Sequence, residues 1–183
     1  MSAAHVSSEP SAWVQRWSHL VAPHARVLDV ACGSGRHLRW FSQRGCRVTG
    51  VDRDAAALES ARASGAELVH ADIENGPWPF AQRRFDLVVV TNYLWRALMP
   101  RIVESVDAGG VLIYETFALG NERYGKPSNP DFLLRPGELL TLMAGLRVVA
   151  FEDGFAAAPE RCVQRIVALR ETDPADDPAR RRL

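Results

Sequence analysis

The chain has 183 residues, a length typical of a single domain. Its 22 basic and 22 acidic residues give a net charge of zero, which provides no general attraction to nucleic acid or to an anionic membrane. The three widely spaced cysteines fit neither a disulfide framework nor a zinc site. Residues 1–10 lack the basic and apolar regions of a signal peptide, and no apolar run approaches the roughly 20 residues of a membrane-spanning helix. We therefore expect a cytoplasmic protein without a metal.

The first two thirds of the chain predict alternating helices and strands. Residues 1–10 are small and polar, which predicts a flexible N-terminus, and residues 11–21 show the apolar spacing of one helical face before Pro23. Strands are predicted over 26–30, 47–51, 67–70, 85–90 and 110–115, and helices over 36–44, 54–63 and 94–106. The strands are apolar throughout, as in a sheet covered on both faces. This alternation predicts an α/β fold with a doubly wound, mostly parallel sheet.

The last third of the chain departs from this alternation. Residues 118–135 form a long loop rich in Gly, Asn and Pro, which suggests a functional lid. A helix over 136–144 and strands over 146–151 and 161–169 follow, and the two strands predict an antiparallel hairpin that closes the sheet. Residues 171–183 are charged and Pro-rich, which predicts a disordered tail. Residues 11–170 are therefore expected to form the single domain.

A glycine-rich turn follows the first predicted strand. Gly33 and Gly35 let the backbone pass close to a ligand at the carboxyl end of the sheet, where open α/β folds bind their ligands. Leu38 replaces the third glycine of the dinucleotide-binding pattern, and the carboxylate of Asp29 would repel a pyrophosphate. Asp29 suits a ligand that bears an ammonium or sulfonium charge. The alternative is a turn carboxylate satisfied by backbone N–H groups.

Further carboxylates follow the next two predicted strands. Asp52 lies about 20 residues beyond the turn, where an acidic side chain can accept hydrogen bonds from both hydroxyls of a ribose. Asp54 is a second candidate, although its place before an alanine-rich helix predicts a helix cap. Asp72 ends the third strand and could accept a hydrogen bond from an adenine amino group, with Ala71 or Ile73 packing against the base.

In these motifs the chain resembles the class I S-adenosylmethionine-dependent methyltransferases. The segments that carry the resemblance are VLDVACGSG (27–35), GVDRD (50–54), ADI (71–73), FDLVVVTNYL (85–94) and GGVLIYETF (109–117). The resemblance implies a Rossmann-like sheet of seven strands in the order 3-2-1-4-5-7-6, with the last strand antiparallel. A narrower likeness, in NYLWR (92–96), ETF (115–117) and the loop at 121–139, is to small bacterial methyltransferases described as tellurite-resistance-like.

The same resemblance implies S-adenosyl-L-methionine as the cofactor. The expected cofactor-binding residues are Asp29, Gly33 and Gly35 for the methionine portion, Asp52 for the ribose, Asp72 and Ile73 for the adenine, and Arg53 and Asn92 beside them. Methyl transfer from a sulfonium is an in-line displacement, so alignment is the main task of the enzyme and no covalent nucleophile is required.

The acceptor is expected beyond the fourth and fifth strands. Tyr93 could direct an acceptor atom, Arg96 could bind an anionic group, and Glu115 is a candidate general base; these three are the candidate catalytic residues. The alternatives are a core position for Tyr93 and pairing of Arg96 with a neighbouring helix. His37 lies nearest the cofactor turn, where a surface or capping role is favoured over catalysis.

The sequence favours a small-molecule acceptor, without a membrane or nucleic-acid partner. After the fourth strand, residues 91–94 lack the Pro-Pro of enzymes that methylate exocyclic base nitrogens, and there is no appended basic domain. The alternatives are an RNA methyltransferase, an NAD(P)-dependent oxidoreductase, and a domain that binds the cofactor as a sensor or partner without catalysis.

Overall fold

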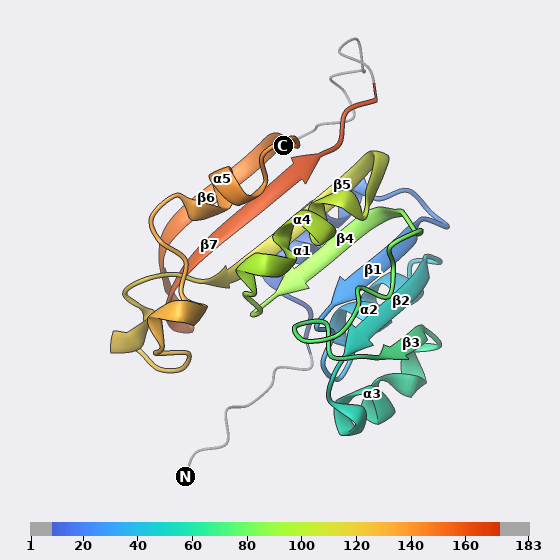
Figure 1. Cartoon of the computed structure of the whole chain (residues 1–183), viewed down its shortest axis with the longest axis horizontal. Helices are drawn as coiled ribbons and strands as arrows, with labels where there is room; N and C mark the ends of the chain where they lie inside the picture. The colour runs from blue at the N-terminus through green and yellow to red at the C-terminus, as the bar shows by residue number, and fades with distance from the viewer. Residues whose placement is uncertain (1–8, 173–183) are drawn as a thin grey trace.

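The computed structural model describes residues 9–172, and a single seven-stranded sheet runs through them (Figure 1). Its strand order is β3-β2-β1-β4-β5-β7-β6. The strands are β1 (Arg26–Val30), β2 (Arg47–Asp52), β3 (Glu67–His70), β4 (Phe85–Thr91), β5 (Val106–Phe117), β6 (Arg147–Ala157) and β7 (Glu160–Leu169). β7 is antiparallel to both β5 and β6, whereas the pairs from β3 to β5 are parallel. The predicted order and the antiparallel last strand are confirmed.

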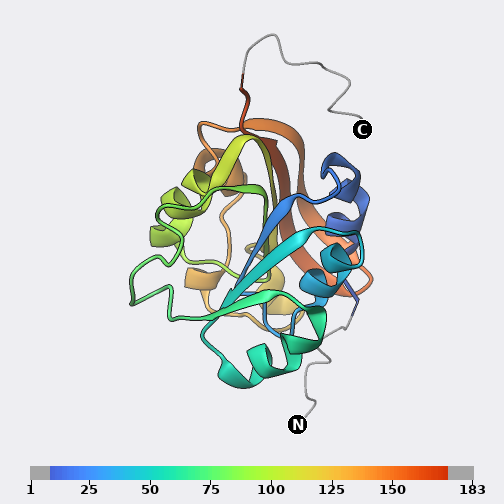
Figure 2. The ribbon, with the colours of Figure 1, turned by 90° about the vertical axis from the view of Figure 1, so that its right-hand side faces the viewer.

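Helices cover both faces of this sheet, as Figure 2 shows. One layer contains α1 (Ala12–Trp17) with the 3₁₀ turn η1 (Ser18–Leu20), α2 (Arg36–Ser42), and α3 (Ala55–Ala61) with η2 (Arg62–Ser64). The other contains η3 (Arg96–Leu98), α4 (Met99–Glu104) and α5 (Glu138–Leu142). The long loop after β5 includes η4 (Asn121–Arg123) and η5 (Pro130–Phe132). The predicted flexible N-terminus and charged tail fall mostly outside the described residues.

The core is divided by the sheet into two apolar layers. In β4, Leu87 and Val89 pack among α1, α2 and α3, whereas Val88 and Val90 pack among α4 and α5. All four side chains are fully buried. Successive side chains of a strand point to opposite faces, so a strand covered on both sides must be apolar at every position. Each such side chain contributes about 1.5–3 kcal/mol through burial.

Two strands are several residues longer than the sequence predicted. β6 extends to Ala157, through Glu152, Asp153 and Gly154, because it lies at the edge of the sheet, where polar side chains reach solvent. β5 begins at Val106, before the glycines at 109–110, and its register with β4 shifts near Phe85. Among residues 9–172, no helix has the length and apolar character needed to cross a membrane.

The antiparallel hairpin positions the start of β7 at the carboxyl edge of the parallel strands. Glu115 of β5 lies opposite Arg165 of β7, and Phe117 lies opposite Val163. The first residues of β7 therefore lie beside the last residues of β5. Arginines of β7, which runs antiparallel to β5, therefore lie near the edge of the sheet that also carries the glycine-rich turn after β1.

Candidate functional site

The turn between β1 and α2 has an unusual backbone at three positions. Ala31, Gly33 and Gly35 have φ angles of 54°, 53° and 77°, in the left-handed region that favours glycine. A Cβ at Gly35 would lie 2.9 Å from the Cβ of Ala61, so this glycine also allows α3 to pack against the turn. At Gly33 a Cβ would meet no atom within 4 Å, which leaves open space beside the backbone.

Asp29 is a buried carboxylate at the carboxyl end of β1. Its relative exposure is 1%, and its Oδ2 has no hydrogen-bond partner among residues 9–172. The nearest cationic candidate is Nδ1 of His37, 3.7 Å from Oδ2, which is too long for a hydrogen bond. The sequence left open that backbone N–H groups satisfy this carboxylate. Among the described residues, no backbone N–H donates to Oδ2. An unpartnered buried carboxylate oxygen is suited to a ligand's ammonium group.

His37 is buried, so the predicted surface position is wrong. Its Nε2 accepts a hydrogen bond from the backbone N–H of Ser11 at 3.1 Å, just before α1. In the neutral ring, accepting at Nε2 puts the proton on Nδ1, the nitrogen nearer Asp29. His37 thereby joins the start of α1 to the cofactor turn.

Asp52 braces the glycine turn from the end of β2. Its Oδ2 accepts a hydrogen bond from the N–H of Gly33 at 2.8 Å, and its Oδ1 accepts one from the N–H of Asp54 at 2.9 Å. Each carboxylate oxygen retains a further acceptor site, so a ribose contact remains a prediction compatible with this geometry. Asp54 accepts from the N–H groups of Ala56 and Ala57, which confirms the predicted cap of α3.

The segment after β3 has two distinct environments. Asp72 is exposed and accepts hydrogen bonds from the side-chain amide and N–H of Asn75 and from the N–H of Glu74. These bonds, with the Asn75 side chain contributing most, lower the pKa of Asp72. Ile73 is buried in the core, and Arg53 pairs with Glu74 at 3.2 Å, which joins the loops after β2 and β3. The adenine contacts of Asp72 and Ile73 stay predictions.

Asn92 and Tyr93 follow β4. Asn92 has a φ of 55° and an exposed side chain, and its N–H donates to the carbonyl of Glu115 at 2.9 Å. The Tyr93 hydroxyl oxygen is buried without a hydrogen-bond partner among the described residues. Burial, and then the Glu74 carboxylate, raise the pKa of Tyr93.

Arg96 makes structural contacts, and its contact with a substrate anion stays a prediction that these contacts do not favour. Its guanidinium forms a two-pronged ion pair with Glu138, with distances of 2.6 and 2.9 Å. It also donates to the carbonyls of Asp131 and Leu133 at 2.6 and 2.9 Å. These contacts join η3 to α5 and to the long loop, which is the neighbouring-helix pairing that the sequence left as the alternative. The physical reason is that Glu138 lies within reach and satisfies the guanidinium.

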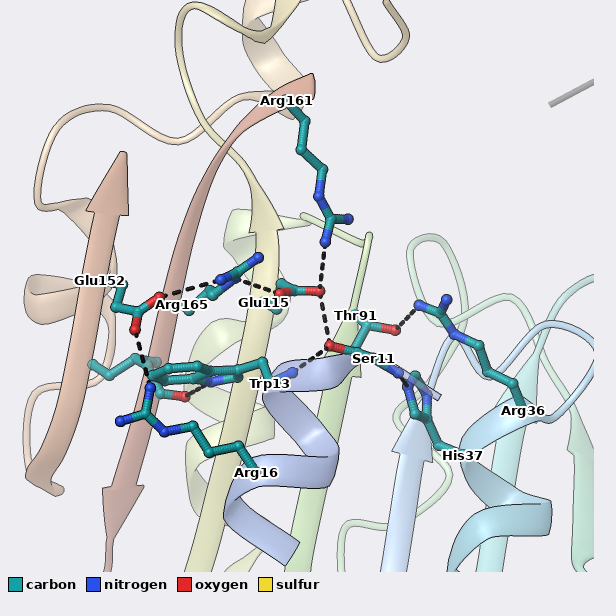
Figure 3. Close-up of polar contacts among 11 residues, drawn as sticks. Ser11, Trp13, Arg16, Arg36, His37, Thr91, Glu115, Glu152, Arg161 and Arg165 are labelled. Atoms are coloured by element: carbon teal, nitrogen blue, oxygen red, sulfur yellow. Dashed lines mark hydrogen bonds and ion pairs between the residues drawn. The ribbon is translucent and has the colours of Figure 1, made fainter. Parts of the chain in front are cut away.

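Glu115 lies at the centre of a polar network that joins α1, β5 and β7 (Figure 3). It is 1% exposed, and its Oε1 accepts a hydrogen bond from the Ser11 hydroxyl at 3.0 Å. Arg165 Nε lies 2.5 Å from Oε2, and Arg161 Nη2 lies 3.6 Å from Oε1. Both oxygens are therefore engaged, and a general-base role for Glu115 remains a prediction that these contacts do not favour.

Sequence reasoning missed Ser11, Arg161 and Arg165. In a chain where nearly every cation is arginine, a single arginine is a weak signal, and Ser11 is 104 residues away from Glu115. One available signal was the four-residue spacing of the two arginines within one strand, because even spacing places both on one face. Among residues 9–172, no group of three or more His, Cys, Asp or Glu side chains is arranged to hold a metal ion.

Comparison with known proteins agrees with this geometry. Residues 27–110, which run from the second residue of β1 through β4 and include the glycine turn, match a family model described as a methyltransferase domain. The structure of TehB from Haemophilus influenzae superposes with a TM-score of 0.75 at 16% sequence identity, over 91% of this chain and 64% of that one. The fold is that of a class I methyltransferase. The family model therefore agrees with the predicted resemblance to methyltransferases, and the solved structure supports the predicted fold.

Two curated methyltransferases each match about half of the chain. The malonyl-[acyl-carrier protein] O-methyltransferase of Enterobacter lignolyticus is 38% identical over 107 residues, which cover 51% of this chain and 39% of the relative. The trans-aconitate 2-methyltransferase of Paracidovorax citrulli is 38% identical over 98 residues, or 48% of this chain and 37% of the relative. The matches thus span less than half the length of either relative.

Proposed function

We propose that this protein transfers a methyl group from S-adenosylmethionine to a small-molecule acceptor. The observation that carries the proposal is the buried Asp29 oxygen without a partner, beside a left-handed glycine turn and at the carboxyl edge of a class I methyltransferase sheet. A fold of this kind binds its ligand at that edge. A buried, unpartnered carboxylate oxygen costs about 1–3 kcal/mol in the free protein, and a cationic ligand would remove that cost.

The residues present fit this cofactor. Asp29 would hold the ammonium group, the backbone from Gly33 to Gly35 would line the methionine portion, and Asp52 would accept the ribose hydroxyls. When bound, S-adenosylmethionine supplies a methyl group on a positively charged sulfur that an acceptor atom can attack in line. The chain contributes mainly alignment, which lowers the barrier by roughly 7–11 kcal/mol in favourable cases. The braced turn, held by Asp52 and by the contact of Gly35 with Ala61, supplies that rigidity.

An acidic acceptor is supported by the names of the two curated relatives. One is named for a malonyl group and the other for trans-aconitate. The balanced charge of this chain supports a small molecule rather than a nucleic acid.

Calorimetric titration with S-adenosylhomocysteine, with NADH in parallel, tests the cofactor half of the proposal. Micromolar binding of the first and none of the second is expected. Product formation from S-adenosylmethionine is then measured across a panel of small carboxylic acids. A folded protein that does not bind S-adenosylhomocysteine would refute the proposal, and one that binds it but methylates none of a broad panel would favour the sensor alternative.

A further inference from the structure

His37 is a buried imidazole that lies between two parts of the site. Its Nε2 accepts the hydrogen bond from the Ser11 N–H at 3.1 Å, and its Nδ1 lies 3.7 Å from the unpartnered Oδ2 of Asp29. The side chains of His37 and Asp29 are both 2% exposed. Figure 3 shows the ring between α2, which carries it, and the residue that caps α1. One nitrogen of the ring therefore holds the start of α1, and the other faces the carboxylate at the end of β1.

Ser11 extends this contact to the end of β5. Its hydroxyl donates to Glu115 at 3.0 Å and accepts from the N–H of Trp13, in the first turn of α1, at 3.1 Å. Ser11 is 8% exposed and Glu115 is 1% exposed. Asp29, His37, Ser11 and Glu115 thus form a row of buried polar groups along the carboxyl edge of the sheet. A change in the charge of the His37 ring acts on both ends of this row.

The neutral and the protonated ring favour different contacts. The neutral ring, with its proton on Nδ1, keeps an acceptor for the Ser11 N–H. The protonated ring has a donor at both nitrogens, so the Ser11 N–H loses its acceptor, while the added charge compensates the carboxylate of Asp29. Histidine is the side chain whose charge ordinarily changes between about pH 5 and 8. A proton on the ring therefore competes with a cationic ligand for Asp29.

Asp29 is the charged group that the His37 ring faces most closely. Among residues 9–172 it is the only carboxylate within 4.0 Å of a ring nitrogen. The other charged side chains of α2, and those around it at the carboxyl edge, have partners elsewhere in the described structure: Arg36, Arg39, Asp52, Arg62 and Glu115. The competition thus concerns one carboxylate and one imidazole.

We propose that His37 is a positioning residue whose neutral form both holds the start of α1 and leaves Asp29 free for the cofactor. This inference rests on the proposed function. Protonation removes both features together, because the ring then pairs with Asp29 and no longer accepts from Ser11. The proton and the cofactor therefore oppose each other, and the affinity for the cofactor falls as the pH falls.

Calorimetry with S-adenosylhomocysteine at about pH 7.5 and about pH 5.5 spans the ordinary histidine range and tests this role. The wild type should bind about 10-fold more weakly at the lower pH, the ratio for one proton excluded from an ordinary histidine. His37→Gln keeps a side-chain oxygen that can accept from the Ser11 N–H and takes up no proton, so it should lose much less affinity between the two pH values. His19→Gln, at an exposed ring on η1, is the matched control and should keep the wild-type pH dependence.

A purely structural role for His37 gives a different result. His37→Gln would then weaken binding by the same factor at both pH values and retain the pH dependence of the wild type. That result, or a wild type whose affinity does not change with pH, would overturn the proposal.

Thermal unfolding without ligand separates this proposal from the proposed function. Asp29→Asn should raise Tm at about pH 7.5, where the carboxylate has no counter-charge, and the gain should shrink at about pH 5.5, where the protonated ring supplies one. In the His37→Gln background the gain should be the same at both pH values. A gain that is independent of pH with His37 present would overturn the proposal. If the gain depends on pH as expected but S-adenosylhomocysteine does not bind, the pairing of His37 with Asp29 is supported and the proposed function fails.

Discussion

Asp29→Asn should make the free protein more stable and the cofactor complex weaker. The substitution keeps the shape of a 1% exposed side chain and removes the charge of a carboxylate whose Oδ2 has no hydrogen-bond partner in the described chain. Leaving a buried polar group unsatisfied costs about 1–3 kcal/mol, and a charged group costs more than an amide. We expect a gain of about 1 kcal/mol or more in the free energy of unfolding. For a protein of this size, that raises Tm by roughly 2–4 °C per kcal/mol.

The effect on binding has the opposite sign. A charge-assisted hydrogen bond to the cofactor's ammonium group contributes about 1.5–3 kcal/mol, so Asp29→Asn should weaken S-adenosylhomocysteine about 10- to 150-fold. The assay is thermal unfolding with and without saturating S-adenosylhomocysteine, accompanied by calorimetry. The variant should have the higher Tm without ligand and the smaller ligand-induced rise in Tm.

Asp86→Asn is the matched control, because the same change is made to a carboxylate with partners. Asp86 accepts from both the N–H and the guanidinium of Arg26 at 2.7–3.0 Å, and this pairing lowers its pKa. Asp86→Asn should lower Tm and leave S-adenosylhomocysteine affinity unchanged. An Asp29→Asn protein that is less stable than the wild type without ligand would contradict the reasoning, since Asp29 would then be a satisfied structural carboxylate.

Three further predictions concern the turn, the network and the loop. Asp52→Ala should weaken S-adenosylhomocysteine about 10-fold or more in calorimetry, and unchanged affinity in a folded variant would exclude the ribose contact. Ser11→Ala removes the cap of α1 and the bond to Glu115, and should cost about 1–2 kcal/mol in denaturant unfolding, whereas Ser11→Thr should cost little. Arg96 lowers the pKa of Glu138 from its ordinary 4.5, so this pair stabilises the fold above that pH and the stabilisation is lost as the pH falls through the lower folded-state pKa. The wild type should accordingly have a higher Tm than Arg96→Gln at neutral pH, and this difference should become smaller in acid. A Tm difference that does not change with pH would contradict the role of the ion pair.

The position of the expected cofactor-binding carboxylates in the fold could be predicted because it depends on residues that are close in sequence. Asp29 is the penultimate residue of β1 and Asp52 is the last residue of β2, and parallel strands bring such ends to one edge of the sheet whatever the loops between them do. The cap at Asp54 followed from the same local reasoning. Each of these predictions needed only the apolar pattern of a strand and the identity of the polar residues at its end.

The other half depends on contacts between segments that are far apart in sequence. The role of Arg96 was decided by Glu138, 42 residues later, and that of Glu115 by Ser11 and Arg165. Local pattern does not reveal which of many arginines meets which carboxylate. The extent of β6 was missed for a related reason, because a strand at the edge of a sheet need not be apolar on either face.

The insertion of β7 between β5 and β6 has a consequence for the order in which the protein is completed during synthesis. Chains emerge from the ribosome with the N-terminal end first, and β5 and β6 both precede the strand that lies between them. Until β7 has been translated, the two strands cannot pair through it, and Glu115 lacks Arg161 and Arg165. A nascent chain that ends after β6 therefore has the glycine-rich turn after β1. It lacks the strand that joins β5 to β6 and the two arginines that pair with Glu115. Truncated translation products should accordingly be targets for chaperones and proteases rather than partly active enzymes.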